Sequence, residues 1–584
     1  MLTSSFDKEP HVEVHEFDHA AFAGYERIGH ELRRAAIARR QARTVIVVEC
    51  YPGVLDDEVL NELKSELRPG HVFLARDANF DNDRIQRMID RNLTDDRVFG
   101  VLSHHKMSEF FDPAKISALR QSIERIQDGI VLVYGTGAMQ VCDPDIFVYA
   151  DLARWEIQLR YRQRKIANWC AENYGEDFLR MYKRGFFVDW RVADREKIRL
   201  LDRIDYLLDT NIADSPRMVA GEAFRAGLRQ AVTRPFRLVP YFDAGPWGGQ
   251  WMKRVCDLDG SAPNYAWCFH GVPEENSLYL KFGDVRVEVP SIDLVFFQPR
   301  ALLGEKVYAR FGTEFPIRFD FLDTMDGGNL SLQVHPTTEY IQSEFGIHYT
   351  QDESYYVLDA GRDACVYLGV KNDLDKEAMF AELHRAQAGE TAFDAEKHVN
   401  RLPAHKHDHY LIPAGTVHAS GANSMVLEIS ATPYIFTFKL WDWGRLGLDG
   451  RPRPVHLEHG RNVLNSRFST DEIRRRHVNH FEAVAEGDGW REERTGLHES
   501  GFLETRRHWF TGVTPHNTHD GVNVINVVEG REVIVESPSG AFQPFVVHYA
   551  ETFIVPAAVG VYTIRPHGPS CGERCATVRA FIRT

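Results

Sequence analysis

Two histidines on separate predicted strands are the residues of this sequence best suited to chemistry. His335 lies near the end of Asn329–Pro336 and His418 lies within Ile412–Ala419, and each histidine stands next to a turn. Side chains two residues apart on a strand share one face, so we expect Gln333 to lie on the same face as His335. Imidazoles that point inward from different strands can bind a divalent metal ion together.

A carboxylate lies between the two histidines in the sequence, because Glu353 opens the predicted strand Ser354–Leu358. Gln333, His335, Glu353 and His418 would form a mixed nitrogen and oxygen site, which suits zinc or a similar transition metal. The chain has 26 histidines, so on spacing alone ordinary packing is an equal alternative. The Pro-Ala-Gly turn before His418 favours the metal site, because such a turn positions the residues that follow it.

Five motifs follow one another between residues 315 and 445. They are Phe315–Asp323, Leu332–Pro336, Glu353–Leu358, Ile412–Ala419 and Trp441–Arg445, and Asp243–Gly249 precedes them. Their order resembles that of class I mannose-6-phosphate isomerases, and the resemblance extends from about Pro240 to Thr584.

The resemblance implies a zinc-dependent protein built from two cupin (jelly-roll) domains. It implies that mannose 6-phosphate and fructose 6-phosphate are interconverted by proton transfer through an enediol, with zinc as Lewis acid and template. The implied ligands of a single zinc ion are Gln333, His335, Glu353 and His418. Arg445 is the implied active-site arginine and would neutralise charge on the enediolate or the phosphate. A structural ion pair with Asp442 is the alternative for Arg445.

Two residues beside the predicted metal ligands depart from the family pattern. The family usually has a lysine two residues before its ligand glutamate and a tryptophan two residues after it, whereas this chain has Gln351 and Tyr355. An amide does not titrate, so Gln351 cannot move the C2 proton and the base is not identified by the sequence. Glu428 follows His418 and is a candidate for orienting a metal ligand.

The departures leave two other functions open. One is a regulatory two-cupin protein that binds a sugar phosphate without turnover. The other is a bifunctional protein with a working N-terminal kinase. In each case the expected partner is a small sugar phosphate, and the oligomeric state is not predicted.

Length and composition limit the remaining possibilities. A chain of 584 residues is expected to form two to four domains. The net charge of −15 argues against nonspecific binding to nucleic acid. The sequence has no apolar run long enough to span a membrane and no apolar signal core at residues 1–10, so we expect a cytoplasmic protein. Cys571 and Cys575 are the only close pair of cysteines and lack partners at zinc spacing, so we expect reduced cysteines.

Residues 1–235 alternate between predicted strands and helices, which indicates a parallel, doubly wound α/β sheet. Long charged helices are predicted from Arg154 to Lys183, and Glu58–Leu67 is a further helix. The predicted strands are Thr44–Cys50, Val72–Ala75, Val98–Leu102, Gly129–Tyr134 and Ile146–Ala150.

The first strand-to-helix turn of this block, Glu49–Leu55, stands where a nucleotide kinase has its phosphate-binding loop. The order of elements resembles the uridine-kinase-like P-loop fold, but the lysine and the hydroxyl residue of that loop are absent. Gly135–Gly137 is too short a glycine signal to replace them. Asp151, Arg154 and Arg160 could bind an anion or belong to a solvated helix face. We therefore expect a degenerate kinase-like domain with a structural or regulatory role.

Residues 236–500 consist of short β-rich runs, such as Leu278–Gly283 and Val366–Val370, which predict an all-β barrel or jelly roll. A helical insertion is predicted from Lys376 to Ala388 with Asp375 as its cap. Residues 456–500 are charged and are expected to be helical or irregular. His405–His409 has three histidines at period two, and we interpret it as a solvated turn rather than a rival zinc site.

Residues 501–584 predict a second, metal-free cupin domain. Val522–Val528 and Val533–Glu536 are predicted strands joined by a tight glycine turn. Glu551–Gly560 echoes His409–His418, and Gly560 stands near where the first copy has its histidine. The repeat therefore keeps the strand and turn but not the metal ligand.

Overall fold

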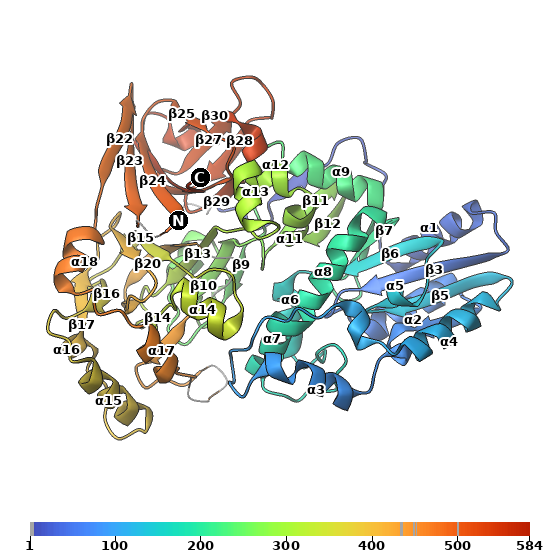
Figure 1. Cartoon of the computed structure of the whole chain (residues 1–584). Helices are drawn as coiled ribbons and strands as arrows, with labels where there is room; N and C mark the ends of the chain where they lie inside the picture. The colour runs from blue at the N-terminus through green and yellow to red at the C-terminus, as the bar shows by residue number, and fades with distance from the viewer. Residues whose placement is uncertain (1–4, 432–435, 448–449, 451–452, 499–500) are drawn as a thin grey trace. The chain divides into compact units, whose positions relative to one another are not determined.

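The computed structural model describes residues 5–431, 436–447, 450, 453–498 and 501–584. The chain divides into two compact units (Figure 1). Unit 1 comprises Met1–Pro10, Ala231–Asn276 and Gln298–Thr584, and unit 2 comprises His11–Gln230 and Ser277–Phe297. The expected boundary at residue 235 therefore lies close to one of the observed boundaries. The exchange of residues 1–10 and 277–297 between the units was not predicted.

Unit 2 contains a seven-stranded sheet in the order β2-β8-β7-β6-β3-β5-β4. Its five strands from β7 to β4 are mutually parallel, as the β-branched runs predict, and β8 and β2 add antiparallel strands at one edge. The strands are β2 (Ala21–Ala23), β3 (Arg43–Cys50), β4 (His71–Leu74), β5 (Gly129–Gly135), β6 (Ile146–Asp151), β7 (Tyr206–Asp209) and β8 (Arg217–Ala220).

Helices connect these strands, which is the arrangement that parallel pairing requires. They are α1 (Tyr25–Ala38), α2 (Asp56–Leu67), α3 (Asn82–Leu93), α4 (Pro113–Glu124), α5 (Ala138–Val141), α6 (Arg154–Arg162), α7 (Phe178–Arg184), α8 (Trp190–Leu200) and α9 (Gly221–Ala231). The long helical stretch predicted from Arg154 is thus two helices, α6 and α7, with an irregular segment between them.

The predicted strand Val98–Leu102 is wrong. The backbone N–H group of Val101 bonds to the carbonyl of Asn92 (2.8 Å), and Asn92 returns a side-chain bond to the carbonyl of Val101 (3.0 Å). These bonds hold the segment against the end of α3 instead of in a sheet. A short apolar run has no periodicity that distinguishes these two environments.

The segment exchanged into unit 2 forms a hairpin of β11 (Ser277–Phe282) and β12 (Val285–Pro290), followed by α11 (Ile292–Phe297). β11 also pairs in parallel with β1 (His11–Glu13), giving a three-stranded sheet. We expected Leu278–Gly283 in the all-β block, and that assignment is wrong. Strand alternation identifies a strand but not the sheet that it joins.

Polar side chains of unit 2 fill the carboxyl ends of its parallel strands. Glu49 accepts N–H groups from Gly137 (2.6 Å) and Met139 (2.8 Å), and burial raises the pKa of Glu49 to about 8. Lys197 bonds to Asp151 (2.6 Å). Ligands of doubly wound sheets bind at this edge, and here the protein's own carboxylates bond to these N–H and ammonium groups.

Unit 1 begins with a β-sandwich of two antiparallel sheets, ordered β18-β15-β20-β13-β10-β9 and β17-β16-β19-β14-β21. We call it the first sandwich. Its strands are β9 (Tyr241–Asp243), β10 (Trp267–Gly271), β13 (Arg318–Asp323), β14 (Leu332–Val334), β15 (Glu353–Ala360), β16 (Cys365–Val370), β17 (Val399–Pro403), β18 (His409–Ile412), β19 (His418–Ser420), β20 (Ser424–Ser430) and β21 (Phe438–Trp441).

Short helices join the strands of the first sandwich. The predicted insertion is confirmed as α15 (Lys376–Gln387), whose first turn is capped by Asp375 accepting the N–H group of Ala378 (3.0 Å). The others are α10 (Trp251–Val255), α12 (Pro299–Leu303), α13 (Glu305–Phe311), α14 (Thr338–Phe345), α16 (Ala395–His398), α17 (Leu457–Val463) and α18 (Thr470–Arg476).

A second sandwich follows, with sheets ordered β22-β23-β24-β31-β26-β29 and β25-β30-β27-β28. Apolar side chains from both sheets, including Phe510, Val527, Val533 and Tyr562, form one core. The strands are β22 (Glu482–Gly487), β23 (Trp490–Leu497), β24 (Leu503–Phe510), β25 (Thr514–Asn517), β26 (Asn523–Glu529), β27 (Glu532–Glu536), β28 (Phe545–His548), β29 (Thr552–Val555), β30 (Val561–Pro566) and β31 (Cys575–Ile582).

The expectation for residues 456–500 is wrong in part, because α17 and α18 are helices there but β22 and β23 are strands. β22 and β23 lie within the stretch expected to be helical or irregular, so the second sandwich begins before residue 501. β22 is an exposed edge strand rich in charge, a composition that protects sheet edges and hides the strand pattern. The strands β26 and β27 exist as predicted, but they belong to opposite sheets, so the turn at Gly530 crosses the sandwich.

Among the described residues, no helix combines the length and apolar character needed to cross a membrane. The eight cysteines are free, and Cys575 is buried in the core of the second sandwich.

Candidate metal centre

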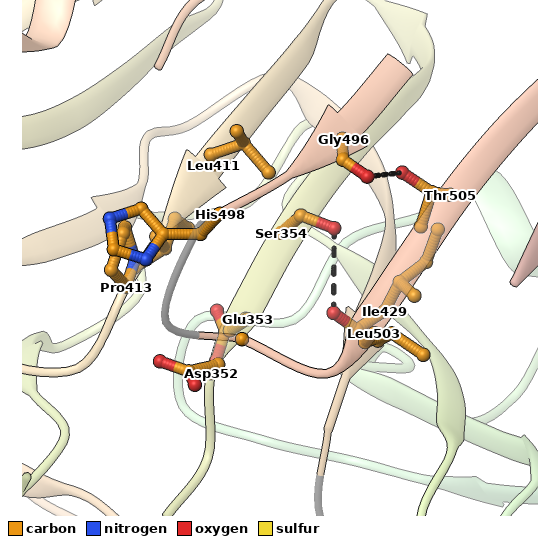
Figure 2. Close-up of a pocket in the computed structure, with 12 residues that line it drawn as sticks. Asp352, Glu353, Ser354, Leu411, Pro413, Ile429, Gly496, His498, Leu503 and Thr505 are labelled. Atoms are coloured by element: carbon orange, nitrogen blue, oxygen red, sulfur yellow. Dashed lines mark hydrogen bonds between the residues drawn. The ribbon is translucent and has the colours of Figure 1, made fainter. Parts of the chain in front are cut away.

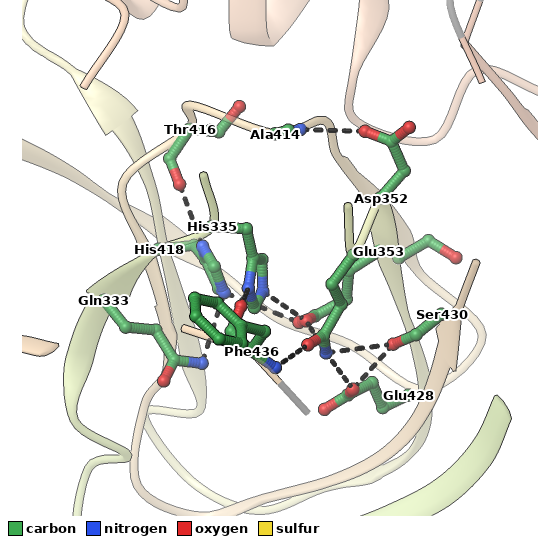
Figure 3. Close-up of polar contacts among 12 residues, drawn as sticks. Gln333, His335, Asp352, Glu353, Ala414, Thr416, His418, Glu428, Ser430 and Phe436 are labelled. Carbon is green, nitrogen blue, oxygen red and sulfur yellow. Dashed lines mark hydrogen bonds and ion pairs between the residues drawn. The ribbon is translucent and has the colours of Figure 1, made fainter. Parts of the chain in front are cut away.

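Four side chains converge between the two sheets of the first sandwich (Figure 3). Gln333 lies on β14, His335 follows that strand, Glu353 opens β15 and His418 opens β19. His335 Nε2 lies 2.7 Å from one oxygen of Glu353, and His418 Nε2 lies 3.5 Å from the other. Gln333 Nε2 lies 3.3 Å from His418 Nε2. One ligand atom from each of His335, Glu353 and His418 lies within 4.8 Å of the others.

Backbone carbonyls fix the orientation of both imidazoles. His335 Nδ1 bonds to the carbonyl of Phe436 and His418 Nδ1 to the carbonyl of Thr416, each at 2.9 Å. A carbonyl only accepts hydrogen bonds, so each neutral ring has its proton on Nδ1. The Nε2 lone pairs of His335 and His418 are therefore directed at the carboxylate of Glu353, which is the arrangement of histidines that bind a metal.

Burial sets the charge state of the cluster, since all four side chains are less than a tenth exposed. Burial lowers the pKa of His418 to about 4, so its ring is neutral at pH 7. Burial alone would raise the pKa of Glu353, but His335 and His418 outweigh it and hold that pKa below its usual range. The carboxylate of Glu353 thus faces the Nε2 atoms of both imidazoles.

These contacts fit a bound cation. Oxygen Oε1 of Glu353 is buried and accepts no hydrogen bond among the described residues. Buried acceptors without partners are rare in proteins, and a cation bound between this oxygen and the two imidazoles would give it a partner. Two imidazoles, a carboxylate and an amide oxygen from Gln333 are a donor set for zinc.

Gln351 holds Glu353 in place. Its Nε2 group lies 3.1 Å from Glu353 and 3.0 Å from Glu428, and its amide oxygen accepts the N–H group of Phe436 (3.0 Å). Burial, with the nearby charges of Asp320 and Glu353, raises the pKa of Glu428 well above its usual range. Glu428, a candidate from the sequence for orienting a metal ligand, therefore reaches the carboxylate of Glu353 through Gln351.

Arg445 lies in an ion pair. Its guanidinium is 2.7 Å from Asp442, which also bonds to Arg453 (3.0 Å) and to the hydroxyl of Ser331 (2.8 Å). This is the alternative that the sequence left open for Arg445. Ser331 immediately precedes β14, so the Asp442 loop is tied to the strand that carries Gln333.

Lys439 is a residue of this region that the sequence analysis missed. It lies on β21 directly opposite Gln333 on β14, and cross-strand partners share a face. Burial lowers the pKa of Lys439 to about 7, with Arg453 and Arg445 reinforcing the shift. Lys439 lies two residues before the Trp441–Arg445 motif, and residues two apart on a strand share a face. This spacing is the signal in the sequence that points to Lys439.

Aromatic side chains pack around the cluster. Tyr355 is fully buried, and its ring lies 5.9 Å from the ring of His418, edge to face. Trp247 is buried against Trp267 with ring centres 4.7 Å apart.

A narrow cavity of about 30 Å³ borders the cluster (Figure 2). Its lining includes Asp352, Glu353 and Leu411 of the first sandwich and Gly496 and Leu503 of the second. This volume is about that of one water molecule. It is too small for a sugar phosphate.

A family model and individual proteins each match part of the chain. Residues 24–233, most of unit 2, match a family described as a domain of unknown function (DUF8485). Mannose-6-phosphate isomerase ManA of Bacillus subtilis is 25% identical over 261 residues, which is 43% of this chain and 73% of that protein. Mannose-6-phosphate isomerase of Streptococcus mutans is 27% identical over 220 residues, which is 37% of this chain and 64% of that protein.

Solved structures with a similar arrangement carry related names. The mannose 6-phosphate isomerase of Bacillus subtilis matches with a TM-score of 0.48 and 18% identity, covering 59% of this chain and 99% of that one. A variant of phosphomannose isomerase from Salmonella typhimurium matches with a TM-score of 0.46 and 13% identity, covering 60% and 100%.

Proposed function

We propose that this protein is a zinc-dependent isomerase that interconverts mannose 6-phosphate and fructose 6-phosphate in a two-cupin unit. The observation that carries the proposal is the buried cluster of two imidazoles around Glu353, one of whose oxygens has no hydrogen-bond donor among the described residues. The similarity to proteins named mannose-6-phosphate isomerase supports the choice of substrate. Gln333, His335, Glu353 and His418 would hold one zinc ion.

Bound zinc would supply Lewis-acid stabilisation of the negative charge that develops on the sugar oxygens. The protein's own contribution is to orient and to balance charge. Gln351 keeps the position of Glu353, because its N–H group bonds to that carboxylate. Lys439, opposite Gln333, and Arg445, which pairs with Asp442, are the basic groups that would face a phosphate or an enediolate.

The test is a coupled isomerase assay on a small panel of aldose phosphates, with the full chain stripped by a chelator and then reloaded with zinc. We expect turnover of mannose 6-phosphate that disappears on chelation and returns with zinc. If the zinc-loaded protein turns over a different aldose phosphate, the proposed substrate is wrong but the proposed reaction class is kept. If the zinc-loaded protein turns over no aldose phosphate of the panel, the proposal that it is an isomerase is wrong.

A regulatory protein that binds a sugar phosphate without turnover is the second candidate function. It is favoured by Gln351, which cannot transfer a proton and is held by bonds to Glu353, Glu428 and Phe436. Binding of mannose 6-phosphate without turnover in the wild type, together with turnover in Gln351→Lys, would establish it.

We propose a structural or regulatory role for unit 2. The N–H groups of Gly137 and Met139, which lie at the carboxyl edge of the parallel sheet, already bond to Glu49. Saturable binding of ATP with magnesium to the full chain, abolished in a Gly137→Val variant, would instead support the bifunctional kinase.

A further inference from the structure

A second pocket lies in unit 1, where β22 to β24 of the second sandwich meet the turn between β17 and β18. Its volume is about 420 Å³, within the usual range of small-molecule sites. Lys406 and His407 from the turn line it on one side. The turn is part of His405–His409, in which His405 is exposed as predicted but His409 is buried.

Positive charge is concentrated in this pocket although the chain as a whole carries −15. The lining contains four cationic side chains, Lys406, Arg491, Arg507 and Arg574, and two carboxylates, Asp408 and Glu493.

Internal ion pairs account for three of the four cations. Glu493 pairs with both Arg491 (3.2 Å) and Arg507 (2.8 Å), and Lys406 pairs with Glu529 (2.5 Å). Within the described part of the chain, no carboxylate pairs with Arg574. The pocket therefore has a guanidinium whose charge is not balanced.

Aromatic rings pack against the guanidinium groups of this pocket. Arg574 lies over the ring of Trp509 at 3.9 Å, and Arg507 lies 5.1 Å from the same ring and 4.4 Å from that of Phe481. Stacking fixes the plane of a guanidinium and leaves the N–H groups at its rim available for an anion. Phe481 is itself partly exposed and offers an apolar wall.

We propose that this pocket binds a small phosphate ester, with the phosphate on Arg574 and the remainder of the ligand against Trp509 and Phe481. Planar guanidinium forks match phosphate oxygens in pairs, and the unbalanced charge of Arg574 favours an anion over a neutral ligand. The ester is a nucleotide or a sugar phosphate, since both carry a phosphate. The base of a nucleotide would also stack on the aromatic and guanidinium planes.

The pocket is separate from the candidate metal centre. The turn that lines it belongs to the first sandwich, and the hydroxyl of Tyr356 on β15 lies 3.3 Å from Arg507 and 3.0 Å from His407. Tyr356 and Glu353 are three residues apart on β15 and therefore lie on opposite faces of the sheet. Occupancy of the pocket does not require the metal ligands.

The test is calorimetric titration of the full, zinc-loaded chain with inorganic phosphate, AMP, adenosine and mannose 6-phosphate. We expect AMP or mannose 6-phosphate to bind this pocket, adenosine to bind at least tenfold more weakly than AMP, and raised salt to weaken the phosphate-bearing probes. Arg574→Ala should weaken the binding of the preferred ester at least tenfold, and Arg574→Lys should weaken it less, because lysine keeps the charge but not the fork.

Arg362→Ala is the matched control, since Arg362 is 95% exposed and does not line the pocket. A His335→Ala variant separates the two sites, because binding at the pocket should survive it whether or not the protein is an isomerase. If no phosphate-bearing probe binds saturably, or if Arg574→Ala and Arg362→Ala bind the preferred ester equally well, the proposal is wrong.

Discussion

Lys439 lies opposite Gln333 across the ladder between β14 and β21, so an ammonium group and a candidate metal ligand share one face of the sheet. This pairing places a lysine beside the metal centre although position 351, where related enzymes usually have one, carries an amide. We expect Lys439→Met to reduce kcat at least ~100-fold, the scale of losing one charge-stabilising group.

The Lys439→Met variant should keep its zinc, because Lys439 is not a metal ligand. Zinc content by mass spectrometry and kcat by coupled assay separate these two effects. Lys439→Arg is the conservative control and should retain more activity than Lys439→Met. Equal activity in the wild type and Lys439→Met would contradict a role in turnover.

Removal of a metal ligand should abolish stoichiometric zinc binding. His335→Ala deletes one imidazole and leaves the buried carboxylate of Glu353 without it, so we expect loss of zinc after dialysis. His405→Gln is the matched control, because His405 is 75% exposed in a turn. Full zinc occupancy in His335→Ala would rule out this metal centre.

Gln351 is expected to tune zinc affinity without binding zinc. Gln351→Ala removes the N–H group that orients Glu353 (3.1 Å), and losing such a supporting contact typically costs 10–100-fold in affinity. Competition with a chromophoric chelator measures this effect. The comparison variant Gln351→Glu adds charge against Glu353 and Glu428, so it should bind zinc less tightly than Gln351→Ala.

Buried histidines should make the stability of unit 1 depend on pH. Burial lowers the pKa of His270 to about 4 and that of His409 to about 3, and both side chains are nearly inaccessible. Below about pH 6.5 the unfolded chain binds protons at these positions and the folded chain does not. Stability therefore falls as the pH drops from 6.5 toward 4, by about 1.4 kcal/mol per pH unit for each histidine.

Thermal unfolding at pH 7.0 and 5.5 tests this dependence. We expect the difference between the two midpoints to shrink in His409→Gln and to stay unchanged in His405→Gln, because the side chain of His405 is 75% exposed. The comparison uses the difference between pH values, so a general loss of stability in His409→Gln does not affect it. If the difference between the midpoints at pH 7.0 and 5.5 is the same in His409→Gln and His405→Gln, His409 is not a source of the pH dependence of stability.

The sequence predicted the classes of structure better than their boundaries. Buried β-branched runs such as Arg43–Cys50 and the capped helix after Asp375 were recognisable, because local pattern and burial agree there. Val98–Leu102 and β22 were not recognisable from the sequence. Val98–Leu102 is an apolar run held by side-chain bonds, and β22 is a charged edge strand.

The residues of the candidate site were likewise predictable only in part. The four predicted ligands lie together because strand alternation and turns place each of them locally. Lys439 escaped notice because its position depends on strand pairing, which brings residues 333 and 439 together from distant parts of the sequence. The bonds from Gln351 to Glu428 depend on the same long-range pairing.

The exchange of residues 1–10 and 277–297 between the units means that the backbone passes from one unit to the other at four places. Neither unit corresponds to an uninterrupted stretch of sequence. Cutting the gene at residue 235 would remove a hairpin and a helix from unit 2 and the first ten residues from unit 1. A cut at a single position of the sequence therefore does not separate the two units.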